Sequence, residues 1–175
     1  MIIFMLSSFI RKRNMLYDFI FRSLYKHNVR YLLCGGVAVN IYGIARMTSD
    51  IDILLDFEKD NIERFQKAAA EIGYSPAIPI SIFELADSVS RIKLIKEKNL
   101  IAFSLVNTMS PYATLDIIAD VPIAFAELWE RKKIRIMKEY ELYVVGIKDL
   151  IELKKYAGRI QDNQDIELLK RIVNE

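Results

Sequence analysis

Two aspartates one residue apart are the side chains in this sequence whose spacing most clearly suggests chemistry. Asp50 and Asp52 lie in "SDIDILLDF", where apolar and polar residues alternate, so the segment reads as a strand with both carboxylates on one face. Like charges in this arrangement repel each other unless a cation or a set of donors lies between them. Carboxylate oxygens suit Mg²⁺ or Mn²⁺, and such an ion also binds substrate phosphates. The spacing predicts a divalent metal site that receives a phosphate-bearing substrate.

The residues before the aspartates supply groups that bind phosphate. Gly35 and Gly36 lie between a strand-like and a helix-like segment, where a missing side chain allows close approach and free backbone N–H groups face an anion. Arg46 and Thr48 add a guanidinium and a hydroxyl shortly before Asp50. Each piece alone has an ordinary structural explanation as a turn cap, a solvated sheet edge or a helix start. Their combination predicts phosphate donors beside metal ligands.

The elements that must position these residues alternate along the chain, without an internal repeat or linker. Helices are predicted over residues 14–27, 37–42, 58–72 and 123–130, with two more in 147–173 that separate near 158–163. Strands are predicted at "RYLLCG", "SDIDILLDF", "RIKLI", "IAFSLVN" and "ATLDIIAD", with a turn at "MSP" before the last, and "IRIMKEYELYVV" predicts a hairpin. This order predicts an α+β fold.

Composition indicates a folded globular chain without a strong overall charge. The 175 residues are 53% hydrophobic, enough to bury one full core. Lysine and arginine number 25 against 23 acidic residues, and a net charge of +2 argues against duplex DNA as a partner. The single cysteine, Cys34, excludes an intramolecular disulfide and a cysteine-based zinc cluster. Reducing conditions suit such a chain, so a cytoplasmic location is expected.

The N-terminus is apolar, but its pattern does not match a membrane signal. "MIIFMLSSFI" is about ten residues long, too short to cross a bilayer, and its basic residues follow the apolar stretch instead of preceding it. We therefore expect neither a signal peptide nor a membrane partner. The predicted organisation is a lead over 1–13, whose order the sequence leaves open, a core over 14–146, and C-terminal helices over 147–175 packed on that core as one domain.

The stretch "GGVAVNIYGIARMTSDIDILLD", residues 35–56, resembles the signature of the polymerase-β-like nucleotidyltransferase superfamily. In that signature G-[GS], a spacer helix and [ST]-x-D-x-D form the nucleotide and metal site. The Gly-Gly form followed by R-x-T-x-D-I-D is similar to AbiEii-type toxins and to aminoglycoside and lincosamide nucleotidyltransferases. The resemblance implies the nucleotidyltransferase fold, a mixed and mostly antiparallel sheet with flanking helices and a C-terminal helical pair. It also implies a nucleotide site at Gly35, Gly36, Arg46, Thr48 and Ser49.

The same resemblance implies a third carboxylate on a later strand. Asp116 in "TLDIIAD" lies between apolar neighbours, where a lone aspartate is costly, and so is the expected residue. Asp120, at the end of that segment, is the alternative. Asp50, Asp52 and Asp116 are thus the implied metal ligands and catalytic residues.

A second part of the resemblance lies near the C-terminus. "IKDLIELKKYAGRIQDNQDIELL" is similar to the K-x(4)-R-x-x-D-x-x-D segment of the same relatives, which implies nucleotide contacts by Lys154 and Arg159. The aspartates of this segment, Asp162 and Asp165, have two explanations. They are either functional or structural, with Gly158 ending one helix and Asp162 capping the next.

Together these features imply a Mg²⁺- or Mn²⁺-dependent nucleotidyltransferase that moves an NMP from an NTP to a hydroxyl acceptor. The acceptor is a tRNA, a protein or a small molecule, and the sequence names neither it nor the nucleotide. The implied setting is a toxin–antitoxin pair or phage defence, with a cognate antitoxin as partner. The alternative is a catalytically silent nucleotide- or partner-binding module, antitoxin-like, on the same fold. Three aspartates favour the enzyme, because a silent module gains nothing from a repulsive cluster.

Overall fold

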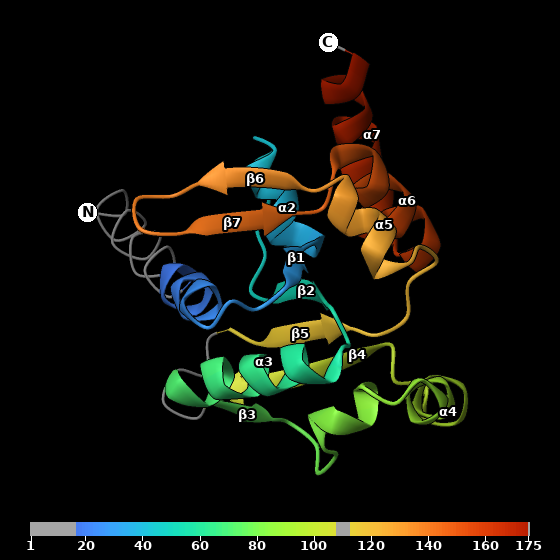
Figure 1. Cartoon of the computed structure of the whole chain (residues 1–175). Helices are drawn as coiled ribbons and strands as arrows, with labels where there is room; N and C mark the ends of the chain where they lie inside the picture. The colour runs from blue at the N-terminus through green and yellow to red at the C-terminus, as the bar shows by residue number, and fades with distance from the viewer. Residues whose placement is uncertain (1–16, 108–112, 175) are drawn as a thin grey trace, which may run out of the picture.

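A computed structural model of the chain describes residues 17–107 and 113–174 and shows one mixed sheet with helices around it (Figure 1). The sheet has seven strands in the order β3-β4-β5-β2-β1-β7-β6. Their bounds are Tyr31–Leu33 (β1), Ile51–Leu55 (β2), Tyr74–Pro76 (β3), Ala102–Asn107 (β4), Leu115–Ile118 (β5), Lys133–Ile136 (β6) and Glu141–Val144 (β7). Only β1 with β7 and β2 with β5 are parallel, and the other pairs are antiparallel.

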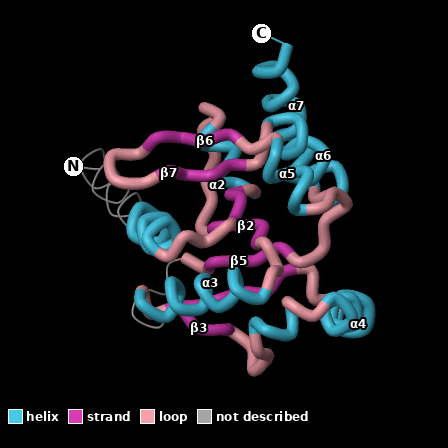
Figure 2. Tube along the Cα trace, in the orientation of Figure 1, coloured by secondary structure: helices cyan, strands magenta, loops and turns pink. Residues whose placement is uncertain are grey.

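Helices flank the sheet, as the cyan segments of Figure 2 show. The first covers residues 17–26. The others are Gly35–Ile41 (α2), Lys59–Glu71 (α3), Ser88–Lys98 (α4), Phe125–Glu130 (α5), Ile147–Ala157 (α6) and Ile160–Asn174 (α7), with a 3₁₀ turn at Ile82–Leu85. α6 and α7 contact each other and lie together at one end of the sheet (Figure 1).

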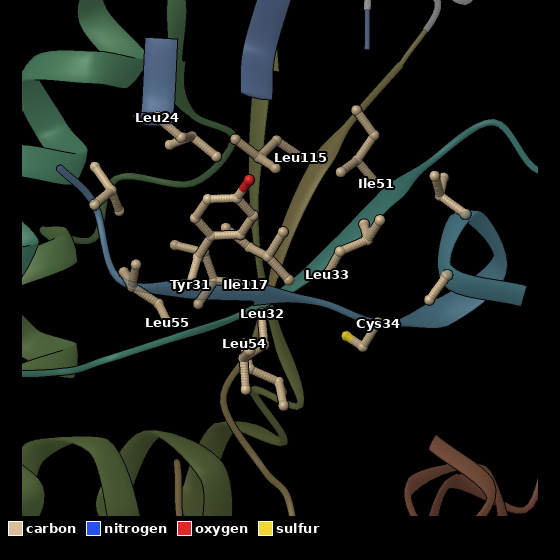
Figure 3. Packing of buried hydrophobic residues seen from close by; sticks show 14 of the residues in the cluster. Leu24, Tyr31, Leu32, Leu33, Cys34, Ile51, Leu54, Leu55, Leu115 and Ile117 are labelled. Atoms are coloured by element: carbon tan, nitrogen blue, oxygen red, sulfur yellow. The ribbon is translucent and has the colours of Figure 1, made fainter. Parts of the chain in front are cut away.

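The two faces of the central strands have different roles. On one face Tyr31, Ile117 and Leu115 are fully buried, and Leu24 of the first helix packs over them (Figure 3). Burying such a side chain contributes about 1.5–3 kcal/mol, so this face contributes strongly to the stability of the fold. The alternate residues of β2 and β5 point the other way, and they include the two strand aspartates.

Most predicted elements are confirmed, including the α+β class, the mostly antiparallel sheet, the hairpin of β6 with β7 and the C-terminal helical pair. The predicted strand at "RIKLI" is wrong, because residues 88–98 form α4. Asp87 caps this helix by accepting the backbone N–H of Ser90, and only Leu94 within it is buried. The five residues of "RIKLI" alternate between polar and apolar types as a strand would, but in α4 the apolar Ile92 is half exposed. So short an alternation does not distinguish a strand from a surface helix.

Two predicted segments lie outside the described residues: the N-terminal lead over 1–13, and the turn at "MSP". The division of the chain into a core and appended helices stays a prediction. Within the described part of the chain, no helix is both long enough and apolar enough to cross a membrane.

Candidate active site

Asp52 and Asp116, here called the carboxylate pair, are direct neighbours across two parallel strands. β2 and β5 pair in a register that sets Asp52 opposite Asp116. The flanking residues of β2, Ile51 and Ile53, are fully buried in the core on the other face. Because side chains alternate along a strand, both carboxylates must project from the opposite face. Asp50 lies just before β2, two residues from Asp52, and accepts a hydrogen bond from the Ser49 hydroxyl at 3.0 Å.

The carboxylate pair opens into a cavity of about 480 Å³ between the sheet and α6. Gly35 and Cys34 line it at the end of β1, and Lys154 and Arg159 line it from the C-terminal helices. Its apolar wall consists of Leu54, Ile101, Ile118, Val121, Leu150, Leu153 and Ala157. A volume of this size suits a small-molecule ligand, with charged groups at one end and an apolar wall at the other.

Burial and mutual repulsion make the carboxylate pair hard to ionise. Burial raises the pKa of Asp52 above its usual range, the charge of Asp116 raises it further, and Arg159 and the Gly36 backbone N–H act against this. Burial also raises the pKa of Asp116, with Asp50 adding to the effect and the Ser104 hydroxyl opposing it. Asp116 Oδ1 is buried and has no hydrogen-bond partner among the described residues. Such an oxygen favours a cation as its missing partner.

The glycine pair makes room for side chains of the site itself. Gly35 has a φ of +60°, and a Cβ there would lie 1.8 Å from Asp52 Oδ2. A Cβ on Gly36 would lie 2.8 Å from Thr48 Oγ1 and 3.0 Å from Arg46 Nη1. The space beside these glycines is therefore occupied by the Asp52 carboxylate and by the side chains of Arg46 and Thr48. Gly35 also lines the cavity.

A second charged group, here called the ion network, joins α6, α7 and the segment before β2. Its members are Arg46, Lys154, Arg159, Asp162 and Asp165. Lys154 Nζ donates to Asp162 Oδ1 at 2.9 Å and to Asp165 Oδ2 at 2.7 Å, and all three side chains are at most 6% exposed. Arg46 Nη1 donates to Asp165 at 2.8 Å, and Arg159 Nε donates to Asp162 at 3.1 Å.

The aspartates of the ion network are compensated, unlike the carboxylate pair. Burial alone would raise the pKa of Asp162, but Lys154 and Arg159 outweigh it and hold that pKa below its usual range. Asp162 is the third residue of α7, and it accepts the backbone N–H of Arg159 at 3.3 Å. It therefore stabilises the start of α7 from inside the helix and is not its N-cap residue.

The structure brings some of the predicted site residues to the cavity and leaves others outside it. Asp52, Asp116, Gly35, Lys154 and Arg159 line it. Gly36, Arg46, Thr48, Ser49 and Asp50 are not among the lining residues of the described chain. No three His, Cys, Asp or Glu side chains of the described residues lie close enough to hold a metal ion. The expected three-carboxylate cluster is thus present as a pair with Asp50 nearby.

Sequence reasoning missed one polar contact and one apolar wall. The Tyr156 hydroxyl donates to Asp120 Oδ2 at 3.0 Å, and both residues line the cavity. From the sequence, Asp120 is expected only as the alternative to Asp116. The wall residues Leu150, Leu153 and Ala157 share one face of α6 with Lys154, and their three- and four-residue spacing was visible in the sequence.

A second cavity, of about 580 Å³, continues from the first. The two share Leu54, Ile118, Asp120 and Val121. Leu54 and Ile118 lie two residues beyond the carboxylate pair on their strands, so one sheet face forms the floor of both cavities. The second cavity therefore extends the first along the sheet face, past the carboxylate pair.

Comparisons with known proteins agree with this arrangement. A family model described as nucleotidyl transferase AbiEii toxin, type IV TA system, matches residues 15–151. Among solved structures, the chain is similar to the lincosamide antibiotic adenylyltransferase LnuA, lincomycin-bound, at 18% sequence identity and a TM-score of 0.56 over 93% of this chain and 96% of that chain. It is also similar to ANT(2")-Ia in complex with adenylyl-2"-tobramycin, at 12% identity and a TM-score of 0.57 over 90% of this chain and 87% of that chain. At such identities the two structures show a shared fold alone. No curated protein matches the chain.

Proposed function

Because the chain belongs to the family of AbiEii nucleotidyl transferase toxins of type IV toxin–antitoxin systems, we propose that it is a metal-dependent enzyme that moves an NMP from an NTP to a hydroxyl acceptor. Nucleotidyl transfer in a toxin–antitoxin setting follows from the family. The metal, the triphosphate and the residue roles belong to the proposal. The matched region ends at residue 151, so the roles of Lys154 and Arg159 depend on the structure alone.

One observation carries the proposal: a partly buried carboxylate pair, with one buried and unpartnered oxygen among the described residues, lines a cavity that also presents cations. Asp52 and Asp116 are adjacent across parallel strands, and burial raises the pKa of both. A chain that used this pair only for packing would be more stable with uncharged residues there. Uncompensated charge at the floor of a cavity is instead typical of a functional site.

The residues present fit a Mg²⁺ or Mn²⁺ ion. Two carboxylates suffice, because Mg²⁺ is usually bound by one or two of them together with waters and substrate phosphates. Asp52 and Asp116 would hold the ion, with Asp50 next to them, and Asp116 Oδ1 has no other partner among the described residues. A bound ion would neutralise the triphosphate and polarise the reacting phosphorus.

The chain's own residues then have distinct tasks. Arg159 presents a half-exposed guanidinium to the cavity, anchored through Nε to Asp162, and would bind the phosphates. Lys154 lies behind it with two carboxylate partners and adds positive charge to the same wall. Gly35 leaves room for the Asp52 carboxylate to approach the backbone. The wall of α6 offers apolar surface to the nucleoside.

The transfer reaction needs one base, which accepts the proton of the acceptor hydroxyl. The acceptor oxygen bonds to the α-phosphorus, the bond from that phosphorus to the bridging β-oxygen breaks, and pyrophosphate leaves. Asp116 would take the acceptor proton, because its carboxylate lines the cavity next to the proposed place of the reacting phosphate. The second cavity shares part of its wall with the first and is where we place the acceptor, whether a tRNA, a protein or a small molecule.

Label transfer tests the proposal. The protein is incubated with each α-³²P-labelled NTP, with Mg²⁺ or Mn²⁺, and with total RNA or cell lysate as the source of acceptor. We expect label in one acceptor class, lost with chelator and lost in Asp52→Ala. Equal labelling by wild type and Asp52→Ala would exclude the proposed site. Nucleotide binding without transfer under any condition would favour the silent module instead. A cognate antitoxin, when co-expressed, is expected to reverse growth inhibition caused by the active protein.

A further inference from the structure

The segment of residues 43–50 joins α2 to β2 and ends at Asp50, two residues before Asp52. It is poorly packed for a segment so close to the carboxylate pair. Met47 is 91% exposed, and a Cβ on Gly43 would meet no described atom within 4 Å. Ile44 packs against the core near the start of the segment. Beyond Ile44 the path of the segment depends mainly on polar contacts.

The strongest of these contacts joins the segment to α7. Arg46 Nη1 donates to Asp165 Oδ2 at 2.8 Å, and Nη2 donates to Gln161 Oε1 at 3.2 Å. The Asp165 side chain is 6% exposed and that of Arg46 is 20% exposed, so this ion pair is largely shielded from water. Charge-assisted bonds in such surroundings are stronger than neutral ones.

The same residue also joins the segment to α2. The backbone N–H of Arg46 donates to Asn40 Oδ1 at 2.8 Å, and its guanidinium lies beside Gly36, where a Cβ would come within 3.0 Å of Nη1. Arg46 thus lies between the start of α2 and the face of α7. It does not line the nucleotide cavity in the part of the chain that the structure describes.

We propose that Arg46 is a positioning residue, which fastens residues 43–50 to α7 through Asp165 and thereby sets the place of Asp50 beside the carboxylate pair. This role replaces the phosphate contact expected from the sequence, and it rests on the proposed function. Loss of Arg46 should slow the reaction step, because misplaced reacting groups lower the rate at saturation. It should leave NTP affinity almost unchanged, because Arg159 supplies the phosphate contact.

Three variants test this role. Arg46→Met removes the ion pair with Asp165 and the hydrogen bond to Gln161. Arg46→Lys keeps the charge, and Arg159→Met removes the proposed phosphate ligand. Label transfer at saturating NTP gives the rate, and equilibrium dialysis of labelled NTP gives the Kd. For Arg46→Met we expect a rate about 30-fold lower and a Kd within about threefold of wild type. Arg46→Lys should recover part of the rate. Arg159→Met should raise the Kd about tenfold or more.

Two results would overturn the role. A Kd raised by Arg46→Met as much as by Arg159→Met, with an unchanged rate, would make Arg46 a phosphate ligand. If Arg46→Met changes neither the rate nor the Kd, Arg46 is neither a positioning residue nor a phosphate ligand.

Hydrogen exchange separates a failed role from a failed function or fold. Amides of residues 43–50 should exchange about tenfold faster in Arg46→Met, with slow exchange kept in β1 and β5. Tyr17→Phe is the matched control, because Tyr17 also tethers this segment, donating to the Thr48 carbonyl at 3.3 Å, but without charge. In Tyr17→Phe the exchange of residues 43–50 should change less than in Arg46→Met. If wild type transfers no label, the proposed function fails. The hydrogen-exchange result still tests whether Arg46 fastens residues 43–50 to α7. If the amides of residues 43–50 exchange at the same rate in Arg46→Met as in wild type, the positioning role of Arg46 is overturned.

Discussion

The carboxylate pair and the ion network are neighbours around one cavity, but their charges are compensated differently. Asp52 and Asp116 repel each other, and burial raises both of their pKa values. In the ion network, Lys154 bridges two carboxylates and holds the pKa of Asp162 low. The chain can therefore balance buried charge where it needs a fixed structure. The imbalance at the carboxylate pair is best explained by a ligand that supplies the missing positive charge.

The first way to sharpen this comparison is to remove one charge of the carboxylate pair. Asp52→Asn and Asp116→Asn should each lower label transfer about 10⁴-fold, or about 5.4 kcal/mol of transition-state stabilisation, because the metal and the base are lost. The unfolding free energy of the metal-free protein should not fall, since repulsion is relieved. Kinetics and urea unfolding measure the two effects. Asp60→Asn, exposed in the first turn of α3, is the control and should leave transfer unchanged, with an unfolding free energy lower by at most about 1 kcal/mol. A large loss of stability in Asp52→Asn would show that the pair is compensated after all.

The second prediction concerns the ion network and has the opposite sign for stability. Lys154→Met leaves Asp162 and Asp165 without their shared cation, and should lower the unfolding free energy by about 4 kcal/mol. Lys155→Met is a matched control, because this adjacent lysine is half exposed and its one ion pair among the described residues is with Glu152 on the same helix. That change should stay within about 0.5 kcal/mol. Equal effects of the two variants would remove the distinction between the two charged groups.

The third prediction tests how closely the glycine pair fits the carboxylate pair. Gly35→Ala places a methyl group 1.8 Å from Asp52 Oδ2 at a φ of +60°, so it should displace that carboxylate and abolish transfer. Its cost in stability should be about 2 kcal/mol. Gly73→Ala has a similar φ of +79°, but its Cβ lies 3.4 Å from Asn107 and far along the chain from the site. It should cost about 1 kcal/mol and leave transfer unchanged. An active Gly35→Ala variant would contradict the described contact.

The smallest expected effect is a pH dependence of opposite sign in the two charged groups. Because folding raises the pKa of Asp52 and Asp116, the metal-free protein should gain stability as pH falls from their folded pKa toward the ordinary value of about 3.8. Asp162 has a lowered pKa, so its contribution is full above that ordinary value and is lost as pH falls through the folded pKa. Comparing urea unfolding of wild type, Asp52→Asn and Asp162→Asn across pH 3–6 separates them. An Asp52→Asn curve parallel to that of wild type would contradict the raised pKa.

Much of the fold could be predicted because its signals are local. The alternation in "SDIDILLDF" places Asp52 opposite the core, and glycines at 73 and 158 end helices in left-handed conformations. The 3₁₀ turn at Ile82–Leu85 also had a signal that was missed, a capping box between Ser81 and Glu84. β3 had none, because three residues that include a proline carry no usable period.

The site was less predictable because its contacts span long distances in the sequence. Arg46 and Asp165 are 119 residues apart, so no local pattern shows that they form an ion pair. The sequence could group Lys154, Arg159, Asp162 and Asp165 by spacing, but only packing of α6 on α7 shows that they compensate one another. The sequence thus predicted which residue types form the site. It did not predict which charged side chains are paired within the protein and which are available for a ligand.

The measurement that tests the central claim most directly is Mn²⁺ binding by electron paramagnetic resonance, with and without a non-hydrolysable NTP analogue. Wild type should bind Mn²⁺ together with the analogue, and binding should weaken as the pH falls because metal binding requires both carboxylates to be ionised. Asp116→Asn should lose this binding while remaining folded. Equal Mn²⁺ binding by wild type and Asp116→Asn would show that the carboxylate pair is not the metal site.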